Sequence, residues 1–180
     1  VARMGPAQLV LIERSENALY EIERDLRAHQ TDVSILPLLA DIGDTARMET
    51  ILTTCQPHII LHAAAHKHVP LMELNPEEAI KNNILGTRNL VDAAHNAKVE
   101  RFVMISTDKA VNPSSIMGVS KRIAEMVVRS MNDDPSRTSF VSVRFGNVLG
   151  SSGSVVPIFK EQIASGGPVT VTHPEMNATS

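Results

Sequence analysis

The sequence predicts a doubly wound α/β domain built on a parallel sheet, and three observations support this fold class. Short apolar runs alternate with amphipathic stretches over the first 145 residues, as strands alternating with helices do. Such alternation favours crossover connections and a parallel sheet covered by helices on both faces. The length of 180 residues suits one domain, and the fractions of 43% hydrophobic and 21% charged residues are those of a soluble globular protein.

The first half of the chain supplies three predicted strands and two predicted helices. Strands are expected at the apolar runs 8–12, 33–36 and 58–62. Residues 16–29 show the apolar spacing of a helix. A second helix is expected over 44–54, with Asp44 as its N-cap. Cys55, the one cysteine in the sequence, is interpreted as the end of that helix.

The second half continues the pattern with helices and two further strands. One long helix is expected over 76–96, because Pro76 suits a first turn. Strands are expected at 101–106 and 139–144, with a helix over 115–131 between them. After Phe145 glycines become frequent, and one short helix over about 155–165 is expected. The chain is therefore expected to divide into an α/β domain over 1–145 and a looser region over 146–180.

A Gly-rich turn of the kind that opens a dinucleotide-binding fold does not precede the first predicted strand. Such a turn normally joins a strand to a helix whose N-terminus holds the pyrophosphate. Gly5 is interpreted instead as a helix C-cap followed by Pro6, so the chain is expected to start inside the first helix. The missing strand is central in the order 3-2-1-4-5-6, and without it two parts of the sheet should expose unpaired edges.

Charge and composition exclude several classes of protein. A net charge of −3 and a pI near 6.2 give no basic surface for nucleic acid. No apolar run reaches the roughly 18 residues of a membrane span in this segment. A single cysteine excludes an internal disulfide and fits a reducing, cytoplasmic compartment.

Acidic residues follow the first two predicted strands, where a dinucleotide would bind. Glu13 could accept hydrogen bonds from a ribose diol, which favours NAD over NADP, although Arg14 beside it moderates that preference. Asp41 and the backbone amide of Ile42 could meet the adenine edge. In the alternative interpretation, Glu13 is a surface residue at a strand end and Asp41 belongs to the turn before the next helix.

A hydroxyl, a carboxyl and an amine stand together where the fourth predicted strand ends. They belong to Ser106-Thr107-Asp108-Lys109 and could supply a hydrogen-bond donor, an acid and a base. The following helix carries Met117 and Lys121 on one face, four residues apart. The alternative is a helix cap beside two solvated charges.

These residues and their surroundings resemble an extended short-chain dehydrogenase/reductase, specifically the polysaccharide-biosynthesis group of UDP-N-acetylglucosamine 4,6-dehydratases. Met117 stands where most members of the superfamily have a catalytic tyrosine, which resembles the branch of the group with methionine there. The matching stretches span most of the chain: His62 to Glu73, Asn82 to Thr87, Ser106 to Pro113, Met117 to Lys121, Arg144 to Gly150 and Pro168 to Met176.

The resemblance implies dehydration of a UDP-N-acetylhexosamine to its 4-keto-6-deoxy sugar with NAD as cofactor. Lys109 would be the base at C5, Asp108 the acid for the leaving C6 hydroxyl, and Thr107 a hydrogen-bond partner near the 4-hydroxyl. Lys121 would bind the nicotinamide ribose and favour the 4-alkoxide. A thioether cannot accept the 4-hydroxyl proton, so Asp108 is the best candidate for that step although the sequence leaves it open.

The resemblance also implies a partial NAD-binding domain over 1–145 and the start of a nucleotide-sugar-binding region over 146–180, with binding residues outside the catalytic group. The cofactor would contact Ala63, Ala64, Lys67 and Asn82, and the substrate would contact Lys67, Asn147, Ser154, Val155 and Val169. For Asn147 and the residues after it, ordinary loop chemistry is an equal alternative. The histidines His62, His66 and His68 are interpreted as part of the loop beside the cofactor, not as a metal site.

Two other functions remain open on the sequence alone. The enzyme could also invert C5 or use another UDP-hexose, or the chain could be a truncated, non-catalytic domain that binds a nucleotide sugar. The resemblance implies a UDP-sugar as partner, a homo-oligomer at full length, and a cytoplasmic location, on its own or as the cytoplasmic domain of an inner-membrane protein.

Overall fold

The computed structural model describes residues 1–29, 32–133, 138–146 and 155–169, apart from the side chains of 133 and 155–158. Contacts divide the chain into two compact units, 1–143 and 144–180. This division lies two residues from the one expected from the sequence. The functions expected of the two parts stay predictions.

All five predicted strands form, and they belong to two sheets. Strand β1 (Gln8–Glu13) pairs in parallel with β2 (Ser34–Leu39), with Gln8 opposite Ser34. The second sheet has the order β3 (Ile59–His62), β4 (Arg101–Thr107), β5 (Ser139–Phe145), and β3 pairs in parallel with β4. Strand β2 extends three residues beyond its expected end, through Pro37. A proline is tolerated there because β2 pairs with only one described strand.

The separation into two sheets agrees with the expected absence of a central strand. Among the described residues, β1 has a neighbour only on the β2 side and β3 only on the β4 side. Gly5 is the C-cap of a short 3-10 helix, η1 (Ala2–Met4), and has a left-handed φ of 66°. That conformation is the one that favours glycine.

Four of the predicted helices are confirmed to within one residue at each end. They are α1 (Glu16–His29), α2 (Thr45–Cys55), α6 (Ile116–Ser130) and α7 (Val155–Ala164). Asp44 caps α2 as expected, because its side chain accepts a hydrogen bond from the backbone N–H of Arg47 at 3.0 Å. Cys55 is the last residue of α2.

The stretch from 69 to 96 differs from the prediction in two ways. Residues expected to form a loop include a short helix, α3 (Val69–Leu74). The single helix expected over 76–96 consists of α4 (Pro76–Glu78), a π-helical segment η2 (Ala79–Gly86) and α5 (Thr87–Asn96). A π-helical segment changes which side chains share a face, and such segments are frequent at functional sites. Two short 3-10 helices, η3 (Asp108–Ala110) and η4 (Met131–Asp133), flank α6.

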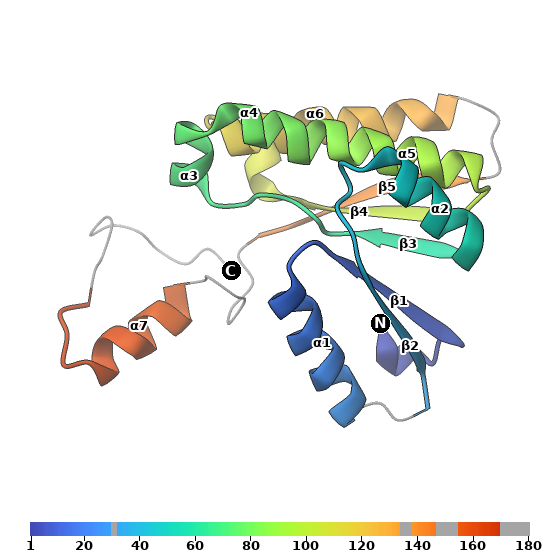
Figure 1. Cartoon of the computed structure of the whole chain (residues 1–180). Helices are drawn as coiled ribbons and strands as arrows, with labels where there is room; N and C mark the ends of the chain where they lie inside the picture. Colours follow the sequence, from blue (N-terminus) through green and yellow to red (C-terminus); the bar gives the residue numbers. More distant parts are fainter. Residues whose placement is uncertain (30–31, 134–137, 147–154, 170–180) are drawn as a thin grey trace. The chain divides into compact units, whose positions relative to one another are not determined.

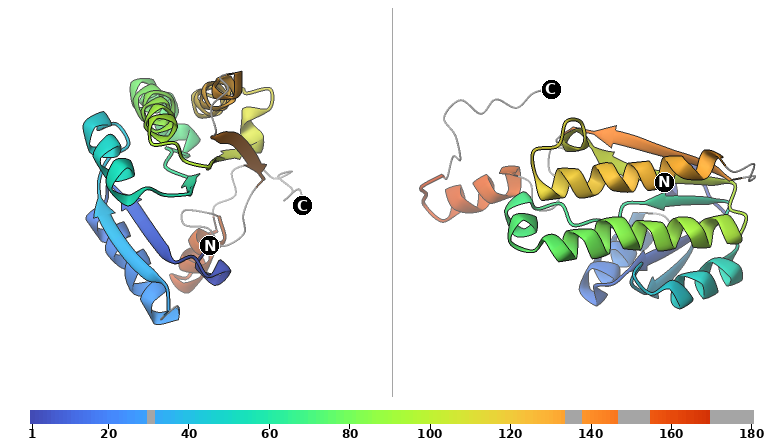
Figure 2. Two further views of the ribbon diagram at one scale, coloured as in Figure 1. Left: turned by 90° about the vertical axis from the view of Figure 1, so that its right-hand side faces the viewer. Right: turned by 90° about the horizontal axis from the view of Figure 1, so that it is seen from above.

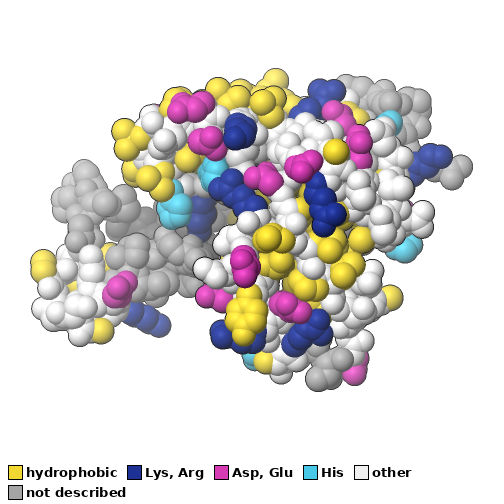
Figure 3. Space-filling model, viewed as in Figure 1, with side chains coloured by type: hydrophobic (Ala, Val, Ile, Leu, Met, Phe, Trp, Pro, Cys, Tyr) yellow, Lys and Arg dark blue, Asp and Glu magenta, His cyan; other side chains and the backbone are white. Residues whose placement is uncertain are grey.

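Helices α5 and α6 lie side by side on one face of the β3–β4–β5 sheet (Figures 1 and 2). The opposite face carries apolar side chains that remain exposed, namely Ile59, Leu61, Val141 and Val143. Among the described residues, helices therefore cover one face of this sheet, and the predicted class of a parallel sheet with flanking helices is confirmed. Apolar side chains also reach the surface at the α3–α4 end of the helix layer (Figure 3), where Leu71, Leu74 and Ile80 are exposed.

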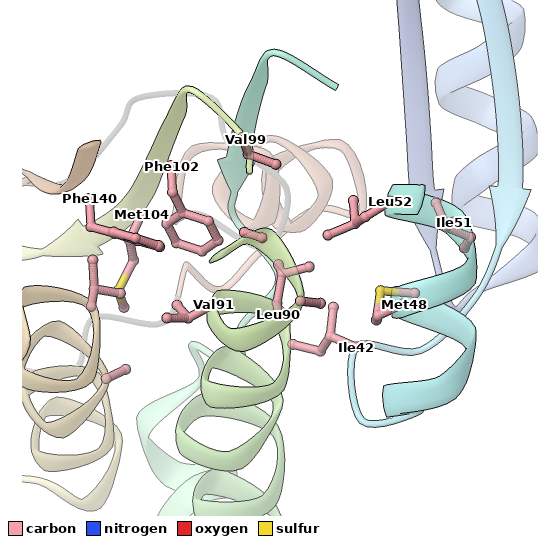
Figure 4. Packing of buried hydrophobic residues seen from close by; sticks show 14 residues of the cluster. Ile42, Met48, Ile51, Leu52, Leu90, Val91, Val99, Phe102, Met104 and Phe140 are labelled. Atoms are coloured by element: carbon pink, nitrogen blue, oxygen red, sulfur yellow. The ribbon is translucent and has the colours of Figure 1, made fainter. Parts of the chain in front are cut away.

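The main hydrophobic core lies between this sheet and its helices (Figure 4). Phe102 and Met104 from β4 are fully buried and meet Val91 from α5. Ile42, Met48, Ile51 and Leu52 join the same core from α2 and the turn before it. This continuous core links α2 to the β3–β4–β5 layer. No helix in the part of the chain that the structure describes is long and apolar enough to cross a membrane.

Candidate active site

Thr107, Asp108 and Lys109 form a compact polar group where β4 ends. The Thr107 hydroxyl donates to Asp108 Oδ1 at 2.9 Å and accepts the backbone N–H of Lys109 at 3.3 Å. Lys109 Nζ donates to the same Asp108 oxygen at 3.2 Å. Asp108 and Lys109 are exposed, so the group has both the helix-cap geometry of one interpretation and the open position that a substrate would need.

The same contacts set the charge of Asp108. The hydrogen bond from Thr107, and after it those from Lys109, hold the pKa of the Asp108 carboxyl below its ordinary value, although partial burial opposes them. Near neutral pH the carboxylate is therefore ionised. In that form Asp108 can accept a proton, and it can act as an acid only after it has done so.

Lys121 projects from α6 toward the same strand end. Its side chain is buried, and Nζ donates to the carbonyl oxygen of Ile105 at 2.8 Å. Burial lowers the pKa of Lys121 to about 8, an effect that the negative charge of Glu125 opposes. The structure thus brings Lys121 to β4 two residues before Thr107.

Met117 lies in an apolar environment. It is 3% exposed and packs with Met72 and Ala79 in a small cluster that also contacts Val69 and Ile116. This side chain contributes packing between α6 and the α3–η2 segment. A catalytic role for Met117 stays a prediction.

Gly118 sets how closely α6 approaches the polar group. A Cβ atom at Gly118 would lie 2.5 Å from the carbonyl oxygen of Lys109 and 3.1 Å from Cβ of Pro113. The first distance is far inside van der Waals contact. The absence of a side chain at this position therefore lets the first turn of α6 pack directly against the backbone of η3.

Asn83, in the π-helical segment, ties the loop after β3 to α6. Its carboxamide accepts the backbone N–H of His66 at 2.8 Å and donates to the His66 carbonyl at 3.0 Å. The same amide donates to the Ser120 hydroxyl at 3.0 Å, and Ser120 donates in turn to the carbonyl of Met117 at 2.8 Å. Asn83 is 1% exposed, so these bonds hold two segments at fixed positions beside the site.

His62 belongs to a second buried chain of hydrogen bonds. The hydroxyl of Thr87 donates to the carbonyl of Asn83 at 2.7 Å and lies 2.8 Å from His62 Nε2. Because the hydroxyl proton is already used, Nε2–H of His62 must be the donor to Thr87. Burial, with a smaller effect from the charge of Lys121, lowers the pKa of His62 to about 3.

We expect this histidine to make the stability of the chain fall at acid pH. The unfolded chain takes up a proton near pH 6.5 and the folded chain only near pH 3, so stability present above pH 6.5 is lost as the pH falls toward 3. Between pH 7 and pH 4 the free energy of unfolding should fall by about 3 kcal/mol more in the wild type than in His62→Gln. Urea unfolding at both pH values measures the difference, and equal losses in the two proteins would contradict it.

The carboxyl ends of β1 and β2 border an open hollow of about 500 Å³ lined by Arg14, Ser15, Leu39, Ala40 and Asp41. Asp41 Oδ1 accepts the backbone N–H of Gly43 at 2.7 Å, as the turn interpretation expects, and Oδ2 lies 3.9 Å from Arg14. The Glu13 carboxylate accepts the N–H of Ser15 at 2.9 Å. Carboxylates and a guanidinium around a hollow fit the hydroxyl groups of an adenosine. The side chain of Ile42 is buried in the core, which leaves only its backbone available to a ligand.

The loop after β3 carries further residues that the resemblance assigns to the cofactor. Ala63, Ala64 and Lys67 are exposed on it. His66 Nε2 lies 3.3 Å from a guanidinium nitrogen of Arg14, so the loop contacts the end of β1. Half-buried Asn82 donates to the carboxamide of Asn83 at 3.0 Å. The expected cofactor residues thus line the carboxyl edge of both sheets, and their contacts with a dinucleotide stay predictions.

Two of the expected substrate residues, Asn147 and Ser154, lie outside the described residues. Val155 is the first residue of α7, and Val169 is exposed. Both belong to the second unit, so their role stays a prediction. The described residues include no group of three or more histidine, cysteine or acidic residues that could hold a metal ion.

Several residues that shape the site had no assigned function in the sequence analysis. They are Glu73, Asn83, Gly118 and Ser120. No local pattern marks them, because each acts through a contact with a residue far away in the chain or with a neighbouring backbone. Ser106 is also buried, and its hydroxyl has no hydrogen-bond partner among the described residues.

Comparison with known proteins adds independent information. A family model described as "Polysaccharide biosynthesis protein" matches residues 1–178. The capsular polysaccharide biosynthesis protein CapD of Staphylococcus aureus is 55% identical over 177 residues, which cover 98% of this chain and 30% of CapD. The UDP-N-acetylglucosamine 4,6-dehydratase (inverting) of Campylobacter jejuni is 34% identical over 172 residues, covering 93% of this chain and 50% of that protein.

A solved structure, that of Pen from Bacillus thuringiensis, matches with a TM-score of 0.86 and 34% identity. The match covers 97% of this chain and 54% of Pen. The chain thus spans between 30% and 54% of the length of these three proteins.

Proposed function

Because this chain belongs to the polysaccharide biosynthesis protein family of extended short-chain dehydrogenases/reductases, we propose that the complete protein is a nucleotide-sugar dehydratase. Its substrate would be a UDP-N-acetylhexosamine, UDP-N-acetylglucosamine first of all, and its product the 4-keto-6-deoxy sugar used in surface polysaccharide synthesis. The observation that carries this proposal is the group formed by Thr107, Asp108 and Lys109, with Lys121 beside it.

A nicotinamide dinucleotide would bind along the carboxyl edge of the two sheets. Arg14 and Asp41 line the hollow at one end of this edge, where Glu13 accepts the N–H of Ser15, and Lys121 lies near the other end. The acidic residues favour NAD over NADP, since a carboxylate repels a 2′-phosphate. When bound, the nicotinamide would supply a hydride acceptor at C4 of the sugar and a hydride donor at C6.

The proton transfers fall to the residues of this chain. Asp108, ionised at the start, would accept the proton of the 4-hydroxyl while Thr107 holds that oxygen. Lys109, as the neutral amine after loss of a proton to solvent, would remove the proton from C5, which the 4-keto group makes acidic, and would return a proton to C5 at the end. Asp108 would then return its proton to the C6 hydroxyl, which leaves as water. The positive charge of Lys121 would favour the transient 4-alkoxide.

The test is turnover of UDP-N-acetylglucosamine by the complete protein. We expect a 4-keto-6-deoxy product with the mass of the substrate less one water, detectable by mass spectrometry and NMR. In deuterated water the product should carry deuterium at C5, because Lys109 exchanges its proton with solvent. An intact protein that binds the substrate and releases no product would instead support a non-catalytic, nucleotide-sugar-binding domain.

A second outcome is inversion of the sugar at C5. The printed name of the Campylobacter jejuni relative, which is 34% identical, includes that stereochemistry. The methionine at position 117 favours retention, because the resemblance is to the methionine branch of the group. A nuclear Overhauser contact between the protons at C3 and C5, which share a face of the sugar ring only when the configuration at C5 is retained, distinguishes the two products.

A further inference from the structure

A hydrogen bond from Glu73 links α3 to the N-terminus of α6. Glu73 Oε1 accepts the backbone N–H of Ile116 at 2.7 Å, across 43 positions of sequence. Ile116 is the first residue of α6, and the first N–H groups of a helix lack partners within the helix. Ser115, the N-cap, satisfies another of them by accepting the N–H of Gly118 at 3.1 Å. The first turn of α6 is therefore held by one local side chain and one distant carboxylate.

Apolar packing supports the same junction. Met72, next to Glu73 on α3, is 6% exposed and packs with Met117 of α6. In the view from above, α3 lies beside the beginning of α6 (Figure 2). A negative carboxylate at this position also interacts favourably with the positive end of the helix dipole. Glu73 thus acts on the position of α6 through both hydrogen bonding and charge.

The first turn of α6 is in turn connected to the reactive group. Gly118 packs against the carbonyl of Lys109 so closely that a Cβ would lie 2.5 Å away. One turn further, Lys121 Nζ donates to Ile105 in β4. A shift of this turn would therefore move Lys121 and the backbone of Lys109 relative to each other.

We propose that Glu73 is a positioning residue for the proposed dehydration: by holding the first turn of α6, it keeps Lys121 in place relative to Asp108 and Lys109. This inference rests on the proposed function of the same site. Glu73 takes no part in the proposed catalytic steps and acts only through the position of α6.

The test compares Glu73→Leu and Glu73→Gln in the complete protein, with Glu77→Leu as the matched control. Leucine cannot accept the N–H of Ile116, whereas the glutamine amide oxygen can. Glu77 is an exposed carboxylate in the first turn of α4. We expect kcat for UDP-N-acetylglucosamine to fall between about 10-fold and 100-fold in Glu73→Leu, as small displacements of catalytic groups do. KM should change by less than about threefold, and both Glu73→Gln and Glu77→Leu should stay within about threefold of the wild type.

Hydrogen–deuterium exchange supplies a measurement that does not depend on turnover. In Glu73→Leu, exchange should rise in the peptide covering 116–120 and stay unchanged in peptides from β4 and α5. A uniform rise over all peptides would mean a general loss of stability and would overturn the positioning role. A normal kcat in Glu73→Leu would overturn it too, and so would a Glu73→Gln variant as impaired as the leucine variant.

The two proposals fail in different ways. If the wild-type protein gives no 4-keto product, the proposed function is wrong. If the wild type is active and Glu73→Leu is equally active, only the role of Glu73 is wrong.

Discussion

Replacing Lys109 with methionine in the complete protein should reduce formation of the 4-keto-6-deoxy product by roughly 10³-fold, within the 10²–10⁴ range of a lost general base. Methionine keeps the length and apolar stem of the side chain and removes only the amine. Substrate binding should change little, because Lys109 is exposed and its amine pairs with the exposed carboxylate of Asp108. The initial rate of product formation and the affinity for UDP-N-acetylglucosamine measure the two effects separately.

Deuterium exchange at C5 makes this test specific. The Lys109→Met protein should no longer exchange the C5 proton of the sugar with deuterated solvent, while the matched variant Lys98→Met should behave like the wild type. Lys98 is an exposed lysine before the amino end of β4. C5 exchange at the wild-type rate in Lys109→Met would show that another group is the base.

Replacing Gly118 with alanine should have the second largest effect, although it adds only one methyl group. The new Cβ would lie 2.5 Å from the carbonyl oxygen of Lys109, so α6 and η3 must move apart by several tenths of an ångström or more. Because the clash is with backbone, a change of rotamer cannot relieve it. We expect kcat to fall by about 100-fold and the free energy of unfolding to fall by about 1–3 kcal/mol, as overpacking usually costs.

The neighbouring residue provides the control for this substitution. Val119 lies on the same turn of α6 and is 40% exposed, so Val119→Ala changes the helix without a clash. Steady-state kinetics and urea unfolding of both variants should show a larger fall in kcat and in the free energy of unfolding for Gly118→Ala than for Val119→Ala. Normal kcat in Gly118→Ala would mean that the spacing between α6 and η3 has no influence on catalysis.

Helix and strand positions were largely predictable where the local pattern was long. Helix α1 has the expected bounds, and Asp44 caps α2 as predicted. Helix α3 was not predicted, because six residues are too few for helical periodicity to show. The π-helical segment was not predicted either. Its extra residue per turn is stabilised by contacts such as those of Asn83 with His66 and Ser120, which lie far away in the sequence.

Part of the candidate site was predictable because some of its residues are neighbours in the chain. Thr107, Asp108 and Lys109 are adjacent in the chain, so their proximity follows from the sequence. The hydrogen bond from Lys121 to Ile105 did not follow, because it depends on how α6 packs on the sheet. The direction of the Asp108 pKa shift did not follow, because it depends on which oxygen the Thr107 and Lys109 side chains reach.

The five strands, the fold class and the resemblance to a dehydratase group could be read from the amino-acid sequence, since these depend on local periodicity and contiguous motifs. The apolar packing of Met117, the close approach of Gly118 to the Lys109 backbone and the hydrogen bond from Glu73 to the start of α6 became visible only in the folded chain. One physical cause accounts for all three. A buried contact or a hydrogen bond between distant segments depends on how helices pack on the sheet, and no local pattern of residues specifies that packing.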